Sequence, residues 1–203
     1  MIPTAFRSYL LLFLFSLFLS LGLGLRPCGA GEIRHSIDTM NFRSVEEDDP
    51  LLGPRVKQSN AFYSIRPPAE WVQKTSGLDN PHYRHSLFFA DPENGDSLSI
   101  GLIEGGPQDL TIESLSRFRG DYLGTFRKSK LGKIVGSDLY RFGHFLCLQA
   151  LFQKNHQLTL QLLVFNQPGT FLQAAFQIDD KRYHSLAREV EACIASLKWP
   201  ELQ

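Results

Sequence analysis

The sequence predicts an α+β fold in which helices flank an antiparallel sheet, and three observations lead to this prediction. Alternating apolar residues indicate a run of strands between residues 142 and 178. Apolar residues spaced three and four apart indicate one helix before these strands and one after them. Short strands, a helix, a strand meander and a terminal helix follow one another, as expected when helices pack on an antiparallel sheet.

The first thirty residues have the pattern of an export signal. Arg7 precedes an apolar run of seventeen residues, Tyr9 to Leu25, and small residues follow at 29–30. Secretion machinery reads a basic start, an apolar middle and a small-residue end. We therefore expect an exported protein of the periplasm or the cell envelope.

Three fates of this segment stay open. Cleavage after Ala30 is favoured, because the run is shorter than the roughly 20 residues of a transmembrane helix and Pro27 would end a helix there. The second fate is retention as an uncleaved membrane anchor. The third is lipid attachment at Cys28, which the preceding Arg26 and Pro27 disfavour.

The charge of the chain excludes one class of partner. The whole chain has 21 basic and 21 acidic residues, and the two basic residues of the first thirty leave 19 basic residues after Ala30. Such a balance gives no positive field to attract a polynucleotide. We expect no nucleic-acid partner.

Residues 31–59 are expected to be a polar, acidic tether without stable structure, followed by one domain over residues 60–203. Glu46 to Asp49 are four consecutive acids, Pro50 and Pro54 follow, and apolar residues are sparse. If the N-terminus stays anchored, the tether would hold the domain clear of the membrane.

The domain is expected to begin with short strands. Residues 62–65 indicate a strand that Pro67 and Pro68 end, and Trp71 begins another extended piece. Residues 86–89 and 98–102 indicate a hairpin, and Asn94-Gly95 predicts a type I′ turn, in which both residues have positive φ. The acids of this loop lack the spacing of an EF-hand, so we read the loop as a solvated turn.

Residues 111–128 predict the first helix. Thr111 is a suitable N-cap. The apolar stripe consists of Ile112, Leu115, Phe118, Tyr122 and Phe126. Gly120 and Gly124 are unfavourable in a helix, and we expect them to reflect a close approach to the sheet.

Three strands are expected over residues 142–153, 157–165 and 171–178. Leu158, Leu160, Leu162 and Val164 alternate with polar residues, so one face of the sheet is core. The other face is mixed, since Leu163, Phe165 and Phe171 share it with polar residues. This mixed face is therefore either partly covered or a contact surface.

A second amphipathic helix is expected over residues 180–198, and it carries one of the cysteines. Cys193 falls on its apolar stripe. Cys147 and Cys193 are either buried thiols, which is favoured, or a disulfide pair, if their Cα atoms come within about 7 Å.

Several short stretches resemble a known family. They are Tyr63 to Trp71 (YSIRPPAEW), Phe88 to Pro92 (FFADP), Thr111 to Leu115 (TIESL) and Ile194 to Leu197 (IASL). With the element order, these stretches over residues 61–199 resemble the PsbP and DcrB-like group of α/β/α sandwiches, which shares its fold with Ran-binding Mog proteins. The resemblance implies a small non-enzymatic domain. Known members are photosystem subunits, envelope lipoproteins, secretion adaptors or binding partners of other proteins.

One alternative is a metal site or an enzyme. His82 and His85, with Asp79, could converge on zinc if they lie in a helix or a turn. In a strand, residues three apart point to opposite faces, and Pro81 disfavours a helix there. No catalytic, cofactor-binding or metal-ligating residue is therefore assigned, and no cofactor is expected.

The function favoured by the sequence is that of an exported, non-enzymatic envelope protein that binds or assembles other proteins. Two surfaces are candidates for docking: the mixed sheet face with Phe165 and Phe171, and the aromatic loop around Trp71. The alternative is a periplasmic metal-binding protein or enzyme that uses His82 and His85.

Overall fold

The structure is a computed structural model that describes residues 48–58, 60, 63–75, 83–129, 132–142 and 145–199. The described residues belong to one compact unit. The export segment, Cys28 and the tether up to residue 47 lie outside the described residues. No described helix is both long enough and apolar enough to cross a membrane.

The described chain has nine strands and two helices. In chain order they are β1 (Val56–Gln58), β2 (Tyr63–Ile65), β3 (Val72–Lys74), β4 (Arg84–Ala90), β5 (Ser97–Glu104), α3 (Ile112–Ser129), β6 (Lys133–Phe142), β7 (Phe145–Lys154), β8 (Gln157–Gln167), β9 (Thr170–Asp179) and α4 (Tyr183–Ala195).

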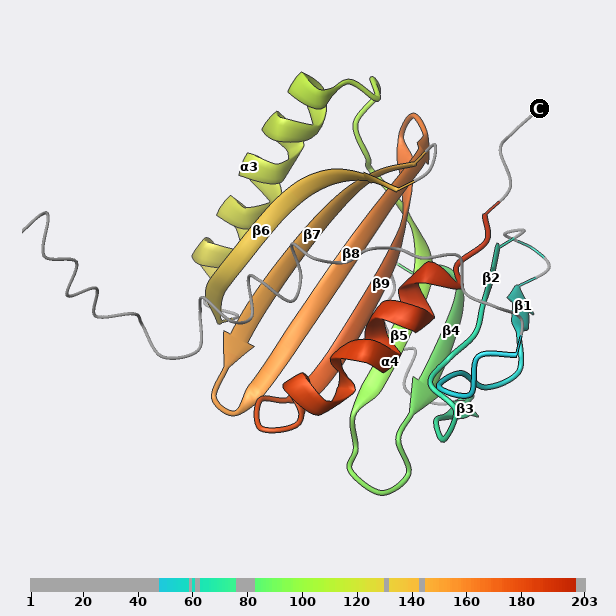
Figure 1. Cartoon of the computed structure of the whole chain (residues 1–203). Coiled ribbons are helices and arrows are strands. Elements are labelled where there is room, and N and C mark those ends of the chain that lie inside the picture. Colours follow the sequence, from blue (N-terminus) through green and yellow to red (C-terminus); the bar gives the residue numbers. More distant parts are fainter. Residues whose placement is uncertain are drawn as a thin grey trace, which may run out of the picture. The chain divides into compact units, whose positions relative to one another are not determined.

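Seven strands form one antiparallel sheet with the order β3-β4-β5-β9-β8-β7-β6. Figure 1 shows α3 on one face of this sheet and α4 on the other. The strands β6 to β9 form a meander, and α3 carries the chain from β5 to the far edge strand β6. The expected α+β fold, an antiparallel sheet between helices, is confirmed.

Helix α3 covers the mixed face of the sheet. A cluster of buried residues lies beneath it: Leu115, Leu148, Leu163, Phe165 and Phe171. The Phe118 ring of α3 meets the rings of Phe165 and Phe171 edge-on at centroid distances of 5.5 and 5.6 Å. The sequence left open whether this face is covered or is a contact surface, and the structure shows that α3 covers it. Phe165 and Phe171 are buried, so the prediction of a docking surface at these residues is wrong.

The opposite face is the other half of the core. Leu160 and Phe176 are register partners on it, and both are almost completely buried. Helix α4 packs toward β9 with Tyr183, Leu186, Val190, Cys193 and Ile194 buried, as its stripe predicts. Cys147 and Cys193 are both free and buried, so they are buried thiols and not a disulfide pair.

The domain begins earlier than expected. Leu52 is buried, and β1 pairs with β2 through Val56 and Ile65. The buried Arg66 side chain donates to the carbonyl oxygens of Gly53 at 2.9 Å and Leu52 at 3.0 Å. These bonds satisfy backbone acceptors of an irregular segment. The prediction that the tether extends to residue 59 is therefore wrong for residues 48–58.

Three further local predictions are corrected by the structure. Strand β6 was not predicted from the sequence, and its pairing with β7 shifts register between Ile134 and Gly136. In the β4–β5 loop only Gly95 has positive φ, so the turn is not type I′. A Cβ at Gly120 or Gly124 would meet nothing within 4 Å, so these glycines do not mark a close approach to the sheet.

Candidate functional site

The candidate site is a pocket beside the start of α4, and we call it the Trp71 pocket. Its cavity volume is about 270 Å³. The lining residues come from three parts of the chain: Pro50, Leu51, Ala69, Glu70 and Trp71 from the entering segment, Asp91 from the β4–β5 loop, and Arg182, Leu186 and Glu189 from α4 and its cap.

The entering segment is fixed against the end of α4. The Arg55 side chain donates to the Ser196 carbonyl oxygen at 2.8 Å, and the Arg66 backbone N–H donates to the Ser196 hydroxyl at 2.8 Å. Ser64 and Lys198 form an isolated antiparallel bridge. Trp71 is buried, with its ring centroid 6.4 Å from that of Phe176 in the sheet. The pocket wall is therefore anchored to both the core and α4.

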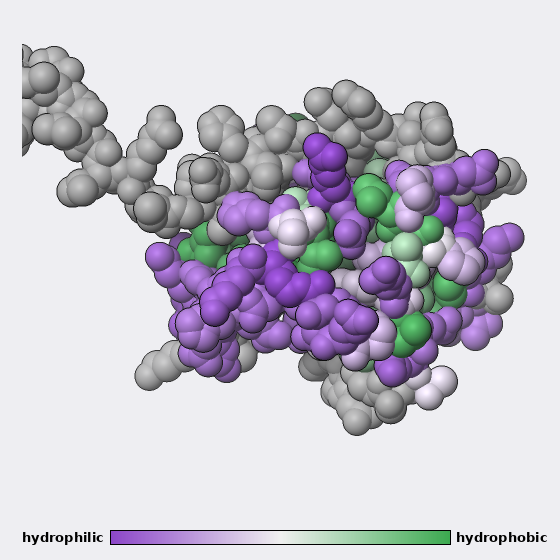
Figure 2. All heavy atoms as spheres, turned by 60° about the horizontal axis from the view of Figure 1, so that its bottom comes forward, coloured by the Kyte–Doolittle hydropathy of each residue, from purple (hydrophilic) through white to green (hydrophobic). Residues whose placement is uncertain are grey.

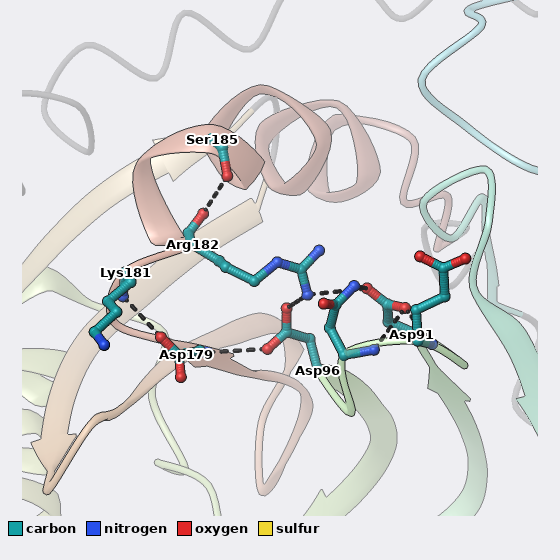
Figure 3. Close-up of polar contacts among 8 residues, drawn as sticks. Asp91, Asp96, Asp179, Lys181, Arg182 and Ser185 are labelled. Carbon is teal, nitrogen blue, oxygen red and sulfur yellow. Dashed lines mark hydrogen bonds and ion pairs between the residues drawn. The ribbon is translucent and has the colours of Figure 1, made fainter.

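A polar cluster, shown in Figure 3, includes two of the lining residues, Asp91 and Arg182. Arg182 Nη1 lies 3.0 Å from Asp91 Oδ2 and 2.5 Å from Asp96 Oδ2, and both carboxylates are buried. The Asp179 backbone N–H donates to Asp96 Oδ1 at 2.9 Å. The cluster ties the β4–β5 loop to the connection between β9 and α4.

The loop itself is shaped by Asp91. Asp91 Oδ1 accepts from the backbone N–H groups of Glu93 at 2.9 Å and Asn94 at 3.2 Å, and Oδ2 accepts from the Asn94 side chain at 3.0 Å. Burial alone would raise the pKa of Asp91, but these bonds and the one from Arg182 outweigh burial, so its pKa lies below the ordinary value. Asp91 is therefore a structural carboxylate.

The second carboxylate of the cluster behaves differently. Burial raises the pKa of Asp96, and the charges of Asp91 and Asp179 raise it further, against the Asp179 N–H bond and the charge of Arg182. Burial is therefore the main reason why Asp96 is harder to ionise than an exposed aspartate, even with Arg182 beside it.

The pKa of Glu189 is also raised. Burial raises its pKa, and the charges of Glu70 and Asp91 raise it further, while Arg182 opposes them. The lining therefore has three carboxylates against one guanidinium that is already ion-paired. A cationic group entering the pocket would relieve this repulsion. The lining residues named above include no serine, cysteine or histidine.

The surroundings of the pocket are polar. Figure 2 turns the lower end of Figure 1 toward the viewer, where the β4–β5 loop and the start of α4 lie. Hydrophilic residues cover most of this end, and smaller hydrophobic areas lie between them. A polar surface around a pocket is typical of the rim of a protein–protein interface.

The sequence pattern predicted one part of this site, the loop at Trp71, but not the roles of Glu70, Asp91, Arg182 and Glu189. Those four residues lie on three separated segments. The prolines before Trp71 indicated an irregular segment, and nothing in the sequence linked it to α4.

The predicted metal alternative stays a prediction. Asp79 and His82 lie outside the described residues. His85 is exposed with φ of 50°, and its carbonyl oxygen accepts a hydrogen bond from the Tyr63 hydroxyl at 2.7 Å. Within the described ranges, no group of three or more histidine, cysteine, aspartate or glutamate residues could hold a metal ion.

The fold resembles that of a protein of known structure. No protein-family model matches the chain, and no curated protein sequence does. The solution structure of cyanobacterial PsbP (CyanoP) from Synechocystis sp. PCC 6803 is similar, with a TM-score of 0.56 and 14% identity over 74% of this chain and 94% of that one. A crystal structure from Bacteroides thetaiotaomicron VPI-5482 gives a TM-score of 0.44 and 17% identity, over 73% of this chain and 49% of that one. The chain has a PsbP-like fold.

Proposed function

We propose that this chain is an exported, non-enzymatic binding module of the cell envelope, and that its Trp71 pocket receives a basic side chain of a protein partner. The observation that carries the proposal is the charge of the pocket. Glu70, Asp91 and Glu189 face a single arginine that the cluster already uses. Burial is the main cause of the raised pKa of Glu189, and the charges of Glu70 and Asp91 add to it.

The size and composition of the pocket support a side chain as its occupant. A volume of about 270 Å³ is below the roughly 300–1,000 Å³ of typical small-ligand sites. Pro50, Leu51 and Leu186 provide apolar surface for the methylene stem of a lysine or arginine, while the carboxylates meet its charged end. The export pattern of residues 1–30 supports the envelope as the place of action.

Site-specific photocrosslinking in the native cell tests this proposal. A photoreactive residue replaces Leu51, which is 37% exposed at the pocket. The control position is Asp121, which is exposed on α3. We expect a discrete crosslinked product in the envelope fraction from position 51 and none of that mass from position 121.

The charge dependence of the product makes the test specific. The double variant Glu70→Gln and Glu189→Gln keeps the shape of the pocket and removes two of its negative charges. We expect this variant to lose most of the product from position 51. An unchanged product in the double variant, or the same product from both positions, would show that the pocket is not the docking site.

A further inference from the structure

A second, separate groove lies at the opposite edge of the sheet, beyond the start of α3. We call it the Ile112 groove. It is lined by Ile112 and Leu115 of α3, by Leu139, Tyr140 and Arg141 of β6, and by Leu146 and Cys147 of β7, and its volume is about 140 Å³. The lining is mainly apolar, and it shares no residue with the Trp71 pocket.

The Ile112 groove exposes apolar surface that the fold does not use. Ile112 is 69% exposed, the largest exposure among the large hydrophobic residues of the described chain. Leu139 and Leu146 pack only partly against the cluster under α3. An aliphatic side chain placed here would bury Ile112, and the removal of this apolar surface from water would favour binding.

The backbone beside the groove suits an extended ligand. Strand β6 is the edge strand of the seven-stranded sheet. Edge strands are the places where extended peptides join a sheet. The Arg119 side chain donates to the carbonyl oxygen of Ser137 at 2.7 Å and to its hydroxyl at 2.9 Å. These bonds leave the middle of β6 less available to a ligand. A ligand would therefore lie alongside the last part of the strand, next to Leu139 and Arg141.

The positive charge of Arg141 at the groove favours a ligand with an acidic group. Arg141 is the register partner of Leu146, so its side chain is on the same face as Leu139 and α3. Among the described residues, no carboxylate forms an ion pair with Arg141 or Arg119, although Glu113 is exposed in the first turn of α3. The exposed guanidinium of Arg141 at an apolar groove complements an aliphatic segment that also carries a carboxylate.

We propose that the Ile112 groove binds an extended peptide segment in which an aliphatic residue and an acidic residue are two positions apart. Alternate residues of an extended peptide share one face. Leu139 and Arg141 have the same spacing on β6, so the aliphatic side chain enters the groove while the carboxylate reaches Arg141. The residue between the two points to the opposite face of the sheet.

Fluorescence anisotropy with synthetic peptides and the full-length protein tests the proposal. The parent probe is a labelled, terminally blocked peptide of serine and threonine with one isoleucine and, two positions later, one glutamate. We expect saturable micromolar binding. Replacement of the glutamate by glutamine, or its move to the adjacent position, should weaken binding about tenfold, because either change removes one charge-assisted hydrogen bond.

Matched protein variants locate the binding. Arg141→Gln and Ile112→Ser should each weaken binding about tenfold. Lys154→Gln removes a positive charge at the other end of β7 and should leave binding unchanged. The Glu70→Gln and Glu189→Gln variant should also leave it unchanged, which separates this groove from the Trp71 pocket.

Three results would overturn the proposal. They are the absence of saturable binding by the parent peptide, equal binding of the peptide with shifted spacing, and full binding by the Arg141→Gln variant. A peptide-free dimer in analytical ultracentrifugation that Ile112→Ser dissociates would also overturn it, since the occupant would then be a second copy of this chain.

Discussion

Gln149 of β7 is a buried residue with a primary amide in its side chain. It is 2% exposed, and neither its Nε2 nor its Oε1 atom forms a hydrogen bond with any residue that the structure describes. Its register partners are Asp138 and Leu162, so it lies on the face opposite α3. A buried amide without partners costs about 1–3 kcal/mol.

Replacement of Gln149 should therefore stabilise the fold. Methionine has a similar shape and no amide to desolvate, so we expect Gln149→Met to raise the free energy of unfolding by about 1 kcal/mol in urea. Gln161 is the control, because its Oε1 accepts from the Tyr122 hydroxyl. Gln161→Met should destabilise by about 1 kcal/mol. Destabilisation by both variants to the same extent would contradict this account of Gln149.

Glu189 should give stability a distinct pH dependence. Its pKa is raised in the folded state, so the folded chain binds more protons than the unfolded chain between the ordinary value and the raised one. Stability from this group is therefore present at low pH and is lost as the pH rises through that window. Glu189→Gln should be more stable than the wild type at pH 7 and equal to it below about pH 4.

Urea unfolding at both pH values measures this effect. The control is Glu93→Gln, because Glu93 is exposed in the β4–β5 loop and does not line the Trp71 pocket. An equal effect of the two substitutions at pH 7 would mean that the negative potential is not specific to the pocket.

Among the elements, helix α3 contains two glycines that lower the stability of the fold and could be replaced. Gly120 and Gly124 are interior helix positions, and a Cβ at either would meet no other atom within 4 Å. Gly→Ala at an unhindered helix position stabilises by about 0.5–1 kcal/mol. We expect each single variant to gain this amount and the Tm of both to rise in thermal unfolding. A loss of stability in either would mean that the glycine serves a contact outside the described residues.

The elements were predictable where side chains alternate cleanly. Leu158 to Val164 put four apolar residues on one face of β8, and the pairing with β9 follows that pattern. Strand β6 was missed because Gly136, Ser137 and Asp138 interrupt its apolar residues and the register shift before Gly136 breaks the alternation. The order of segment 48–58 was missed because it depends on the side chain of Arg66 and on Ser196, and Ser196 is distant in the sequence.

The candidate site was less predictable than the fold, for a similar reason. Asp91 and Asp96 are in a loop that alone looks like a solvated turn. They are buried only because Arg182 arrives from the start of α4, about ninety residues later. Sequence patterns report periodicity along one element, whereas this pocket exists only where three segments meet.

At the scale of the whole molecule, the two described cysteines report global unfolding. Burial raises the pKa of Cys147 to about 12 and also raises that of Cys193, and both thiols are essentially inaccessible. The thiolate is the reactive form, so neither should be alkylated in the native state. We expect iodoacetamide to label both only at the rate of global unfolding, as followed by peptide mass spectrometry. Fast labelling of Cys147 alone would reveal local opening of β7.

The proposed docking of a basic side chain in the Trp71 pocket predicts which residue of the envelope partner is crosslinked to position 51. Mass spectrometry of the crosslinked peptides identifies this residue. We predict that this residue lies within a few positions of a lysine or arginine, and that replacement of that basic residue by glutamine removes the crosslink. A crosslink to a segment without basic residues, or one that persists after every nearby basic residue is replaced, would contradict the claim.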